Sequence, residues 1–458
     1  MKVIVCGAGQ VGFNIARHLA SEQHDVTVID RSPDLIAKIQ SSLDVQAVVG
    51  YASHPDLLEK AGASDADMII AVTLFDEVNM VACQVAHSLF GVPKKIARVR
   101  AQNYLDPVWQ DLFSRDHMPI DVIISPEIEV AQAAIRRLEA PGAFDMVPFC
   151  DGRVRAVGVR LKEDCPVVDT PLRQLTELFP DLNIVVTSVL RDGKLIIPSS
   201  NDQLLVGDNI YFVSEDSHVE RALSVFGRDE EEARRIVIVG GGNVGAFIAK
   251  QLIDNNAKIQ LKIIEQDAKQ AKAVAKEIPS AIVLHGDALD VDIQKEANVK
   301  AAETIIAVTN DDKVNILSSL LAKQAGCRRA ITLINNHSLG PLTYSVGIDA
   351  FVDPRQTTVS SILQHMRRGR IRSLHTIAGG AAEVLEAVAL ETSPLVGKPL
   401  RDIRLPEGII VGSVVRDTKV IVPRGGTIIK PDDIVVVFSR QEKIRKVEEL
   451  FSVRLEYF

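Results

Sequence analysis

Short apolar runs alternate with amphipathic stretches through the first third of the chain. The run Val3–Cys6 has the length and composition of a buried parallel strand, and apolar residues from Val11 to Leu19 follow at helical spacing. Further strands are expected at Val26–Ile29, Val45–Val49, Asp67–Val72, Lys95–Arg100 and Asp121–Ser125, and helices at Pro33–Leu43, Pro55–Ala61, Asp76–Phe90 and Glu127–Leu138. Strands that alternate with helices predict a parallel, doubly wound α/β sheet.

The pattern changes after Pro141-Gly142. Short strands are expected at Val147–Phe149, Val154–Leu161, Ile184–Leu190, Leu195–Ile197 and Asn209–Val213, separated by Asp-Gly or Gly-Asp turns, with one helix near Pro171–Leu178. These elements predict a small α+β module. The charged stretch Gly227–Arg235 is interpreted as a solvated connector.

The whole arrangement then repeats. Gly50-Tyr51-Ala52 returns as Gly286-Asp287-Ala288, and Ala71-Val72-Thr73 returns as Ala307-Val308-Thr309, both 236 residues later. Asn79 returns as Asn315 at the same spacing. The chain is therefore a tandem duplication of a two-part unit. The predicted domains are Rossmann-like N-lobes over 1–140 and 233–370, and α+β C-lobes over 141–228 and 371–458.

A glycine-rich motif follows the first strand of each half. Gly7, Gly9 and Gly12 form G-x-G-x-x-G, which allows a tight strand-to-helix turn, close approach of a pyrophosphate, and close packing of helix on strand. Asp30 ends the second strand 18 residues after Gly12, near the spacing at which an acid meets a ribose hydroxyl. In the second half Gly240–Gly245 and Glu265 repeat this arrangement. The first half is predicted to bind a nucleotide, with NAD favoured over NADP at Asp30, and the second half is predicted to bind a different nucleotide or none.

Composition narrows the class of protein. The 458 residues carry a net charge of −8 and a single Trp, which argues against nucleic acid as the main partner. No apolar run reaches the length of a membrane span, so a cytoplasmic chain is expected. The five cysteines and ten histidines show no metal-ligand spacing, and no metal site is predicted. Cys6 and Cys83 lie within apolar patterns and are expected to be inert core thiols.

Two arginines distinguish the halves. Arg98 and Arg100 alternate on the predicted fifth strand, so both are expected on one face, where two guanidiniums suit a di- or triphosphate. The equivalent stretch Ile331–Asn336 has no arginine, and the halves are inferred to differ in ligand. Pairing of these arginines with acidic residues at a domain contact is the alternative. Thr73 is expected either to bond a phosphate or ribose or to satisfy its own loop.

Machinery to transform a bound nucleotide is not evident in the sequence. A hydride-transfer enzyme needs an acid or base beside the nicotinamide and a second substrate pocket, yet each sheet is followed only by a small strand-rich module. The sequence also lacks G-x-x-x-x-G-K-[ST], so P-loop hydrolysis is unsupported. A nucleotide sensor is favoured, and an NAD-dependent oxidoreductase with duplicated Rossmann domains is the alternative.

The start GAGQVG…VID, the stretch Ala71–Ala86 and the stretch Ile96–Tyr104 resemble the TrkA family of bacterial Trk potassium uptake, built from tandem RCK (regulator of potassium conductance) domains. The resemblance implies a cytoplasmic, non-enzymatic regulator, peripheral on the inner face of the plasma membrane. It implies a homotetrameric ring under a TrkH- or TrkG-type membrane subunit, gated by NAD(H) and ATP or ADP, with no nucleic acid partner.

The resemblance also implies the site residues. Those of the first half are Gly7, Ala8, Gly9, Gln10, Val11, Gly12, Asp30, Thr73, Leu74, Arg98 and Arg100. Those of the second half are Gly240, Gly241, Gly242, Asn243, Val244, Gly245, Glu265, Asp287 and Thr309. The first half departs from the second in having Tyr51 where the second has Asp287.

Two further expectations concern contacts. Helices after Pro126 and Pro354 are expected to be crossovers that pack against a second subunit. The basic cluster of Arg367, Arg368, Arg370 and Arg372 is expected either to be a solvated helix end or to contact an acidic membrane subunit or lipid headgroups.

Overall fold

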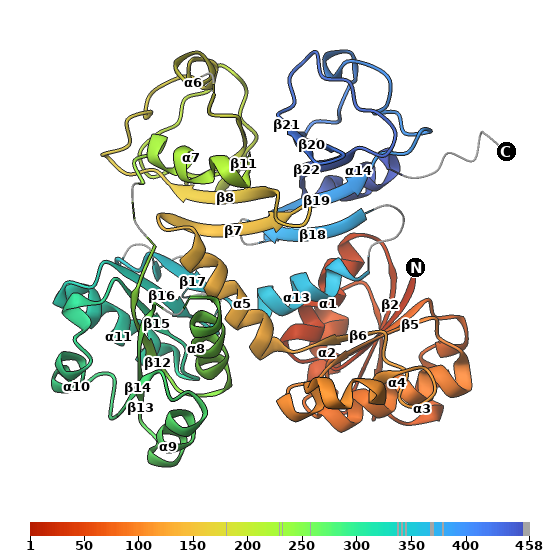
Figure 1. Cartoon of the computed structure of the whole chain (residues 1–458). Coiled ribbons are helices and arrows are strands. Elements are labelled where there is room, and N and C mark those ends of the chain that lie inside the picture. The colour runs from red at the N-terminus through yellow and green to blue at the C-terminus, as the bar shows by residue number, and fades with distance from the viewer. Residues whose placement is uncertain are drawn as a thin grey trace. The chain divides into compact units, whose positions relative to one another are not determined.

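A computed structural model describes residues 1–179, 181–228, 230, 232–256, 258–336, 339, 342–343, 346–366, 371–377 and 380–451. The chain divides into two compact units. One comprises residues 1–129 and 354–366, and the other comprises residues 130–353 and the chain from residue 367 onward. Each unit is described by itself, with the labels of Figure 1.

The first unit is built on a parallel sheet of six strands in the order β3-β2-β1-β4-β5-β6. Its strands are β1 (Lys2–Cys6), β2 (Asp25–Asp30), β3 (Gln46–Val49), β4 (Met68–Ala71), β5 (Lys94–Arg98) and β6 (Val122–Ile124). Its helices include α1 (Gln10–Ser21), α2 (Pro33–Ser42), α3 (Pro55–Lys60) and α4 (Asp76–Phe90). One face of the sheet buries α1 and α2 and the other buries α3 and α4. The predicted doubly wound fold is confirmed.

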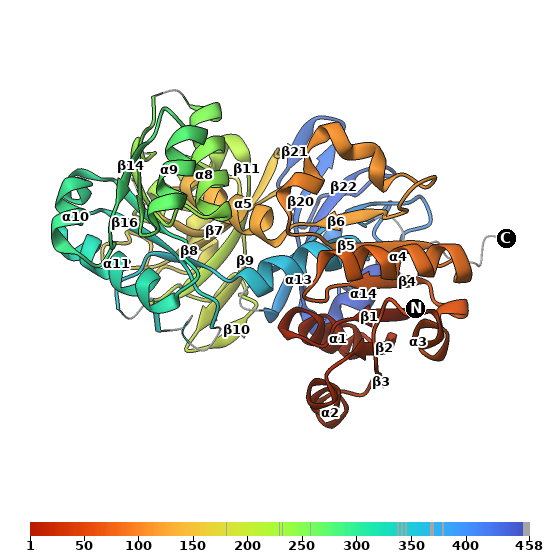
Figure 2. The same cartoon turned by 90° about the horizontal axis from the view of Figure 1, so that it is seen from below.

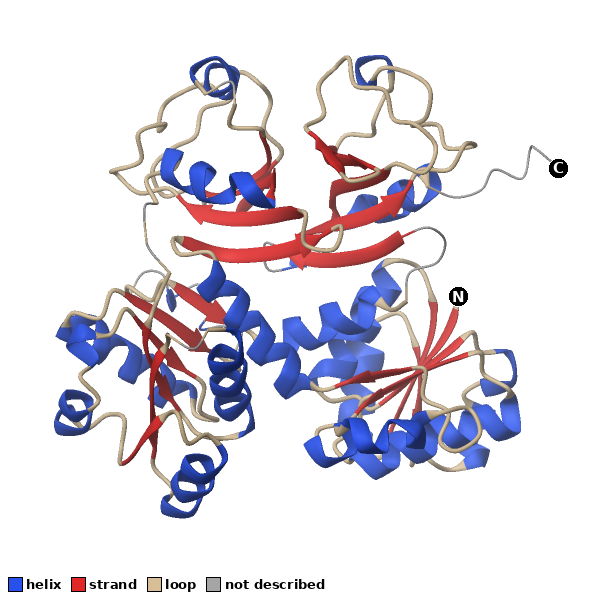
Figure 3. Ribbon diagram, viewed as in Figure 1, coloured by secondary structure: helices blue, strands red, loops and turns tan. Residues whose placement is uncertain are grey.

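A second parallel sheet with the equivalent order β14-β13-β12-β15-β16-β17 lies in the second unit. Its strands are β12 (Arg235–Val239), β13 (Gln260–Glu265), β14 (Ile282–His285), β15 (Thr304–Ala307), β16 (Arg329–Leu333) and β17 (Ala350–Val352). The helices that follow are α8 (Asn243–Asn255), α9 (Ala268–Glu277), α10 (Val291–Glu296) and α11 (Asp312–Ala325). Figure 3 shows the strands of each parallel sheet flanked by helices. The identical strand order confirms the duplication.

The crossover helices pack on the half of the chain to which they do not belong in sequence. After the first sheet, α5 (Pro126–Glu139) buries Val130, Ala134 and Leu138 in the core of the second parallel sheet. After the second sheet, α13 (Pro354–Gln364) packs on α1 in the first unit, where Ile362 lies fully buried. Each of these helices thus packs within its own chain, and the expected packing against a second subunit stays a prediction.

The C-lobes are two antiparallel sheets in the second unit, with the orders β10-β9-β11-β8-β7 and β18-β19-β22-β20-β21. The first C-lobe contains the strands β7 (Ala143–Phe149), β8 (Val154–Arg160), β9 (Ile184–Arg191), β10 (Lys194–Ile196) and β11 (Asn209–Glu215), and the helices α6 (Leu172–Leu178) and α7 (Val219–Val225). The second C-lobe contains the strands β18 (Ile371–Ile377), β19 (Ala382–Val388), β20 (Ile409–Arg416), β21 (Lys419–Ile421) and β22 (Ile434–Arg440), and the helix α14 (Ile444–Leu450). The two sheets share one apolar core that includes Phe149, Val213, Val384 and Phe438. Figure 2 gives a second view of these elements.

Three of the residues in the predicted basic cluster, Arg367, Arg368 and Arg370, lie outside the described residues, whereas Arg372 lies in β18.

None of the helices in the described part of the chain combines the length and the apolar character needed to cross a bilayer.

Candidate functional site

The glycine loop after β1 has the geometry that the motif predicts. Gly7 adopts φ +111°, and a Cβ on Gly12 would lie 1.8 Å from the carbonyl oxygen of Gly7. Both positions therefore require glycine for steric reasons. Gly9 differs, because a Cβ there would meet no atom within 4 Å. The loop is open at Gly9, which leaves room for a ligand to approach the backbone.

Helix α1 begins directly at this opening. Gly9 is its N-cap, no side chain caps the helix, and its first turn carries no acidic residue. The first N–H groups of the helix and its positive dipole end are therefore available to an anion. Helix α8 begins in the same way at Gly242, where a Cβ would also meet open space.

The acid at the end of the second strand holds the glycine loop in both halves. Asp30 accepts hydrogen bonds from the backbone N–H groups of Ala8 (2.7 Å) and Ser32 (2.8 Å). Glu265 accepts from Gly241 (2.6 Å) and Asp267 (2.8 Å). Each carboxylate oxygen retains a further lone pair. The carboxylates thus fix the loop and still have capacity to accept from ribose hydroxyls.

Thr73 lies beside the loop and is tied to a buried amide. An added Cβ on Gly7 would lie 3.0 Å from the Thr73 nitrogen, so the loop and Thr73 are in contact. The Thr73 hydroxyl donates to Oδ1 of Asn79 (2.7 Å), whose Nδ2 donates to the carbonyl oxygen of Arg98 (2.9 Å). The Thr73 hydroxyl thus satisfies its own loop in this structure, and its contact with a phosphate or ribose stays a prediction.

The same network recurs in the second half. The sequence did not indicate that Asn79 and Asn315 hold these strand ends together. Thr309 donates to Asn315 (2.7 Å), and Asn315 donates to the carbonyl oxygen of Leu333 (3.0 Å). Both asparagines are fully buried. The only signal in the sequence was that Asn recurs at the fixed spacing of the repeat, and this signal does not identify the groups to which the asparagines are hydrogen-bonded.

Arg98 is buried at the end of β5. Its Nη2 donates to the carbonyl oxygen of Thr73, whereas its buried Nε has no hydrogen-bond partner among the described residues. Burial, and then the nearby Arg100, lower the pKa of Arg98 to about 10. Neither arginine forms an ion pair with a described residue within 4.0 Å, although Glu127 and Asp76 lie near enough to act on Arg98 electrostatically.

The strand at this position is shorter than expected. Strand β5 ends at Arg98, so Arg98 and Arg100 do not alternate on one strand. The backbone N–H groups of Arg100 and Ala101 donate to Oδ2 of Asp76 (both 2.9 Å), which turns the chain away from the sheet. Glu127 is half-buried here, and burial raises the pKa of its carboxyl. This edge of the sheet therefore gathers two cations and two acids.

The predicted residues of the first half form a continuous strip from Asp30 through the glycine loop and Thr73 to Arg98. Ala8 is buried, and its N–H donates to Asp30. Gln10 and Val11 are the first residues of α1, and Leu74, which follows Thr73 in the chain, is exposed. In the second half Glu265, Gly240–Gly245 and Thr309 form the equivalent strip. Asn243 and Val244 start α8, and Asp287 accepts from the N–H of Leu289 (2.9 Å) within its own turn.

The second strip lacks the cations of the first. Leu333 and Asn335 occupy the positions of Arg98 and Arg100, and Asp312 accepts from the Asn335 N–H (2.8 Å) as Asp76 does from Arg100. The Gln270 amide also donates to the carbonyl oxygen of Gly241 (2.7 Å). The second loop is thereby held by an extra contact, and Leu333 and Asn335 offer a phosphate no positive charge.

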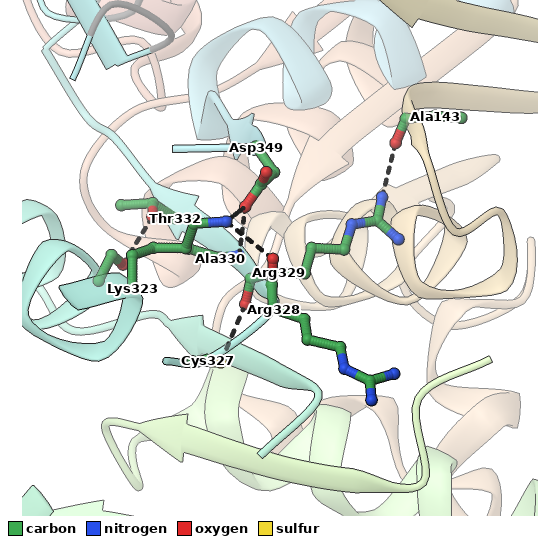
Figure 4. Close-up of polar contacts among 9 residues, drawn as sticks. Ala143, Lys323, Cys327, Arg328, Arg329, Ala330, Thr332 and Asp349 are labelled. Carbon is green, nitrogen blue, oxygen red and sulfur yellow. Dashed lines mark hydrogen bonds and ion pairs between the residues drawn. The ribbon is translucent and has the colours of Figure 1, made fainter. Parts of the chain in front are cut away.

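A separate polar cluster in the second unit is structural. Figure 4 shows the Arg329 guanidinium directed at the carbonyl oxygen of Ala143 (2.6 Å), away from the ion pair of Lys323 with Asp349 (2.9 Å). Burial lowers the pKa of Arg329. The contact fastens the start of β16 to the start of β7.

Cys6 in β1 and Cys83 in α4 have the environment of core thiols. Cys6 and Cys83 are fully buried, and burial raises the pKa of both thiols, that of Cys83 to about 12. The expectation of inert core thiols is confirmed.

Two Rossmann-like sheets, each with a glycine-rich loop after its first strand and each followed in sequence by a small antiparallel lobe, define a duplicated two-lobe module of the RCK type. Family comparison agrees: residues 3–126 and 236–354 match the TrkA-N domain, and residues 156–227 and 384–452 match the TrkA-C domain. The chain belongs to the TrkA family of Trk system potassium uptake proteins.

Sequence relatives support this family assignment, and solved structures support the fold. The chain is 54% identical to a Trk system potassium uptake protein TrkA of Azorhizobium caulinodans and 40% identical to one of Halomonas elongata, each aligned over the full length of both chains. Among solved structures it resembles the GsuK RCK domain, with TM-score 0.59, 18% identity and coverage of 99% of this chain and 95% of that one. The GsuK channel bound to NAD gives TM-score 0.59 at 18% identity, with coverage of 99% and 79%. The expected family and RCK-type fold are confirmed.

Proposed function

We propose that this chain is a nucleotide-sensing regulatory subunit of a Trk-type potassium uptake system. NAD(H) and ATP or ADP bind along the strip from Asp30 to Arg98 and Arg100 in the first half. The observation that carries the proposal is the buried Arg98 Nε, which has no hydrogen-bond partner among the described residues, at the edge of the sheet that bears the open glycine loop. A buried unsatisfied N–H of a guanidinium is costly unless an acceptor such as a phosphate oxygen reaches it.

Each part of the strip has a partner in such a nucleotide. Asp30 accepts from the adenosine ribose, the first turn of α1 faces the phosphates, and Arg98 with Arg100 meets the terminal phosphates of ATP. NAD(H) shares the first two contacts, and the relation to a GsuK channel solved with NAD supports its inclusion.

The second strip is proposed to bind a ligand with less negative charge. Its site residues are Gly240–Gly245, Glu265, Asp287 and Thr309, and it has Leu333 and Asn335 in place of the two arginines. A dinucleotide whose pyrophosphate sits on the α8 N-terminus fits this set better than a triphosphate.

The proposal assigns binding and not catalysis to both strips. The titratable groups gathered at the first strip are engaged with backbone, as Asp30 is, or act as fixed charges, as Arg98 does. Purified protein that binds NADH without consuming it in the presence of carbonyl substrates supports a sensor, whereas steady turnover supports the oxidoreductase alternative.

Regulation requires that binding favour one conformation of an assembly. We assign the chain to a homotetrameric ring, peripheral on the inner face of the plasma membrane, that acts on an integral potassium-transport subunit of the TrkH or TrkG type. The names of its full-length relatives place them in Trk potassium uptake. Gentle extraction from the native membrane tests this assignment: the mass of the complex and the integral protein that co-purifies report both parts.

Calorimetry tests the proposed site directly. Wild-type protein is titrated with ATP and with NADH, beside Arg100→Ala and the control Arg221→Ala, which removes an exposed arginine on α7 in the first C-lobe. The proposal expects nucleotide binding by the wild type and the control, with weaker ATP binding by Arg100→Ala. Absence of both ATP and NADH binding by the wild type overturns it.

A further inference from the structure

Exposed planar side chains lie around the carboxyl edge of the first sheet. Arg31 follows β2 and Phe75 follows β4, and in the sheet order β1 lies between these two strands. The guanidinium carbon of Arg31 lies 5.6 Å from the centroid of the Phe75 ring. Their contact therefore bridges the end of β1, where the glycine loop begins. Phe75 remains 48% exposed, so burial in the core does not explain it.

Phe75 occupies a position where the helix would be more stable with another residue. It is the N-cap of α4 and makes no side-chain cap bond. In the second half the same position is Asp311, which caps α11 by accepting from the N–H groups of Lys313 (2.8 Å) and Val314 (3.4 Å). Asp is a strongly preferred N-cap and an apolar residue is a poor one. The first half thus lacks a stabilising cap and carries an exposed ring instead.

A second cap position on the same edge shows the same exchange. His54 is the N-cap of α3 without a cap bond, and its ring stacks on Tyr51 with 5.2 Å between ring centroids. The second half has Asp290, which caps α10 by accepting from the Asp292 N–H (2.8 Å). At this edge of the sheet, two N-cap positions thus carry the rings of His54 and Phe75 where the second half has capping Asp residues. This exchange indicates that the rings serve a role other than helix stability.

We propose that Arg31 and Phe75 form the base-binding pair of the first nucleotide site. This inference rests on the proposed function and adds the element that recognises the base. Asp30 is assigned to the ribose, so the base joined to that ribose lies within reach of the neighbouring Arg31. Aromatic faces and guanidinium planes are the groups on which bases stack in proteins.

The spacing of the pair defines how it works. A base held between two planes needs about 7 Å, two layers of van der Waals contact. The observed 5.6 Å is shorter, so the two side chains contact each other and must part when the base enters. Both are exposed and can move at little cost in packing. The pair is thus a closed gate over the first glycine loop.

The second half has no such pair. Gln266 and Asp311 occupy the positions of Arg31 and Phe75, and Asp287 replaces Tyr51. Affinity that depends on base stacking is therefore a property of the first site alone.

The test uses Phe75→Asn, which removes the ring and supplies a neutral N-cap. Binding of ATP and of inorganic tripolyphosphate is measured by calorimetry, and thermal unfolding is followed in parallel. We expect the affinity of Phe75→Asn for ATP to be about 5- to 100-fold lower than that of the wild type, which is the effect of losing one base-stacking contact. Tripolyphosphate affinity stays unchanged and the unfolding midpoint rises, because α4 gains its cap.

Two variants complete the test. Phe75→Trp keeps a stacking face and is expected to bind ATP as the wild type does. Val81→Asn, which changes another exposed apolar residue of α4, is the control and leaves both affinities unchanged. Wild-type ATP affinity in Phe75→Asn overturns the inference, as does an equal loss of ATP and tripolyphosphate affinity, which indicates a distorted phosphate site. Failure of the wild type to bind ATP and NADH is the separate result that overturns the proposed function.

Discussion

The Oδ2 atom of Asp30 lies 2.7 Å from the backbone nitrogen of Ala8, so the acid assigned to the ribose also holds the glycine loop in place. The equivalent contact of Glu265 with Gly241 shows that this double role belongs to both halves. Substitution of either acid therefore changes the shape of its loop as well as its ligand contacts.

Asp30→Ala is expected to weaken adenine-nucleotide binding by about 1–3 kcal/mol, because hydrogen bonds from the ribose and from the loop lose their acceptor. Calorimetry with ATP and NADH measures the loss. Asp34→Ala, which removes an exposed acid from the first turn of α2, is the control. Unchanged affinity in Asp30→Ala would count against the site.

Arg100→Ala is expected to cost more affinity for ATP than for NADH. A hydrogen bond to a charged group contributes about 1.5–3 kcal/mol, and only ATP has terminal phosphates for Arg100 to meet. Arg100 is the better test residue because Arg98 also ties β5 to Thr73, so the double variant Arg98→Ala/Arg100→Ala is measured beside it. Equal losses for the two nucleotides reject the polyphosphate role.

The duplicated amide network offers a matched pair of variants. Asn79→Ala and Asn315→Ala each leave buried backbone groups without partners, and each is expected to lower the free energy of unfolding by about 1–3 kcal/mol or more. Only Asn79→Ala, which loosens Thr73 and the backbone of Arg98, is expected to weaken ATP binding as well. Denaturant unfolding and calorimetry separate the two effects. Equal effects of both variants on ATP binding contradict the assignment of ATP to the first half.

A partly buried histidine in β18, His375, predicts that stability falls in acid. Burial, and then the charge of Arg136, lower the pKa of His375 to about 3 from its usual 6.5, and its ring packs edge-to-face on Phe149. Between these two values the unfolded chain binds the proton and the folded chain does not, so stability rises with pH there and falls as pH drops below 6.5. At pH 5 this one group is expected to lower the free energy of unfolding by about 2 kcal/mol relative to neutral pH.

His375→Leu isolates that effect. Its stability in denaturant at pH 7 and at pH 5 is compared with that of the wild type, and the difference between the two pH values is expected to be smaller in the variant. Parallel pH dependences in the two proteins would show that His375 is not the group that titrates.

Local patterns in the sequence were sufficient for the sheets, the duplication, the glycine loops and the position of Asp30. These depend on periodicity and on steric demands that adjacent residues carry, such as the contact of Gly12 with Gly7. The end of β5 was not predictable, because the turn after Arg98 is set by Asp76, distant in sequence. Periodicity likewise shows that α5 has an apolar face but not that the face meets the second parallel sheet.

Side-chain networks were the least accessible part of the site. Asn79 was visible only as a repeated residue, because its two partner residues, Thr73 and Arg98, lie at two strand ends that the fold brings together. The role of Phe75 required both the helix start and its counterpart Asp311 to be known. The occupancy of each site by a particular nucleotide stays a prediction.

The most direct test of the central claim is potassium flux in proteoliposomes that contain the membrane subunit co-purified with this chain. Flux is recorded with ATP, with NADH and without nucleotide, using wild type and Arg100→Ala. The account predicts flux that changes with the nucleotide supplied, and a response to ATP that is shifted to higher concentration in Arg100→Ala. Flux that is the same with and without nucleotide in the wild-type complex would contradict it.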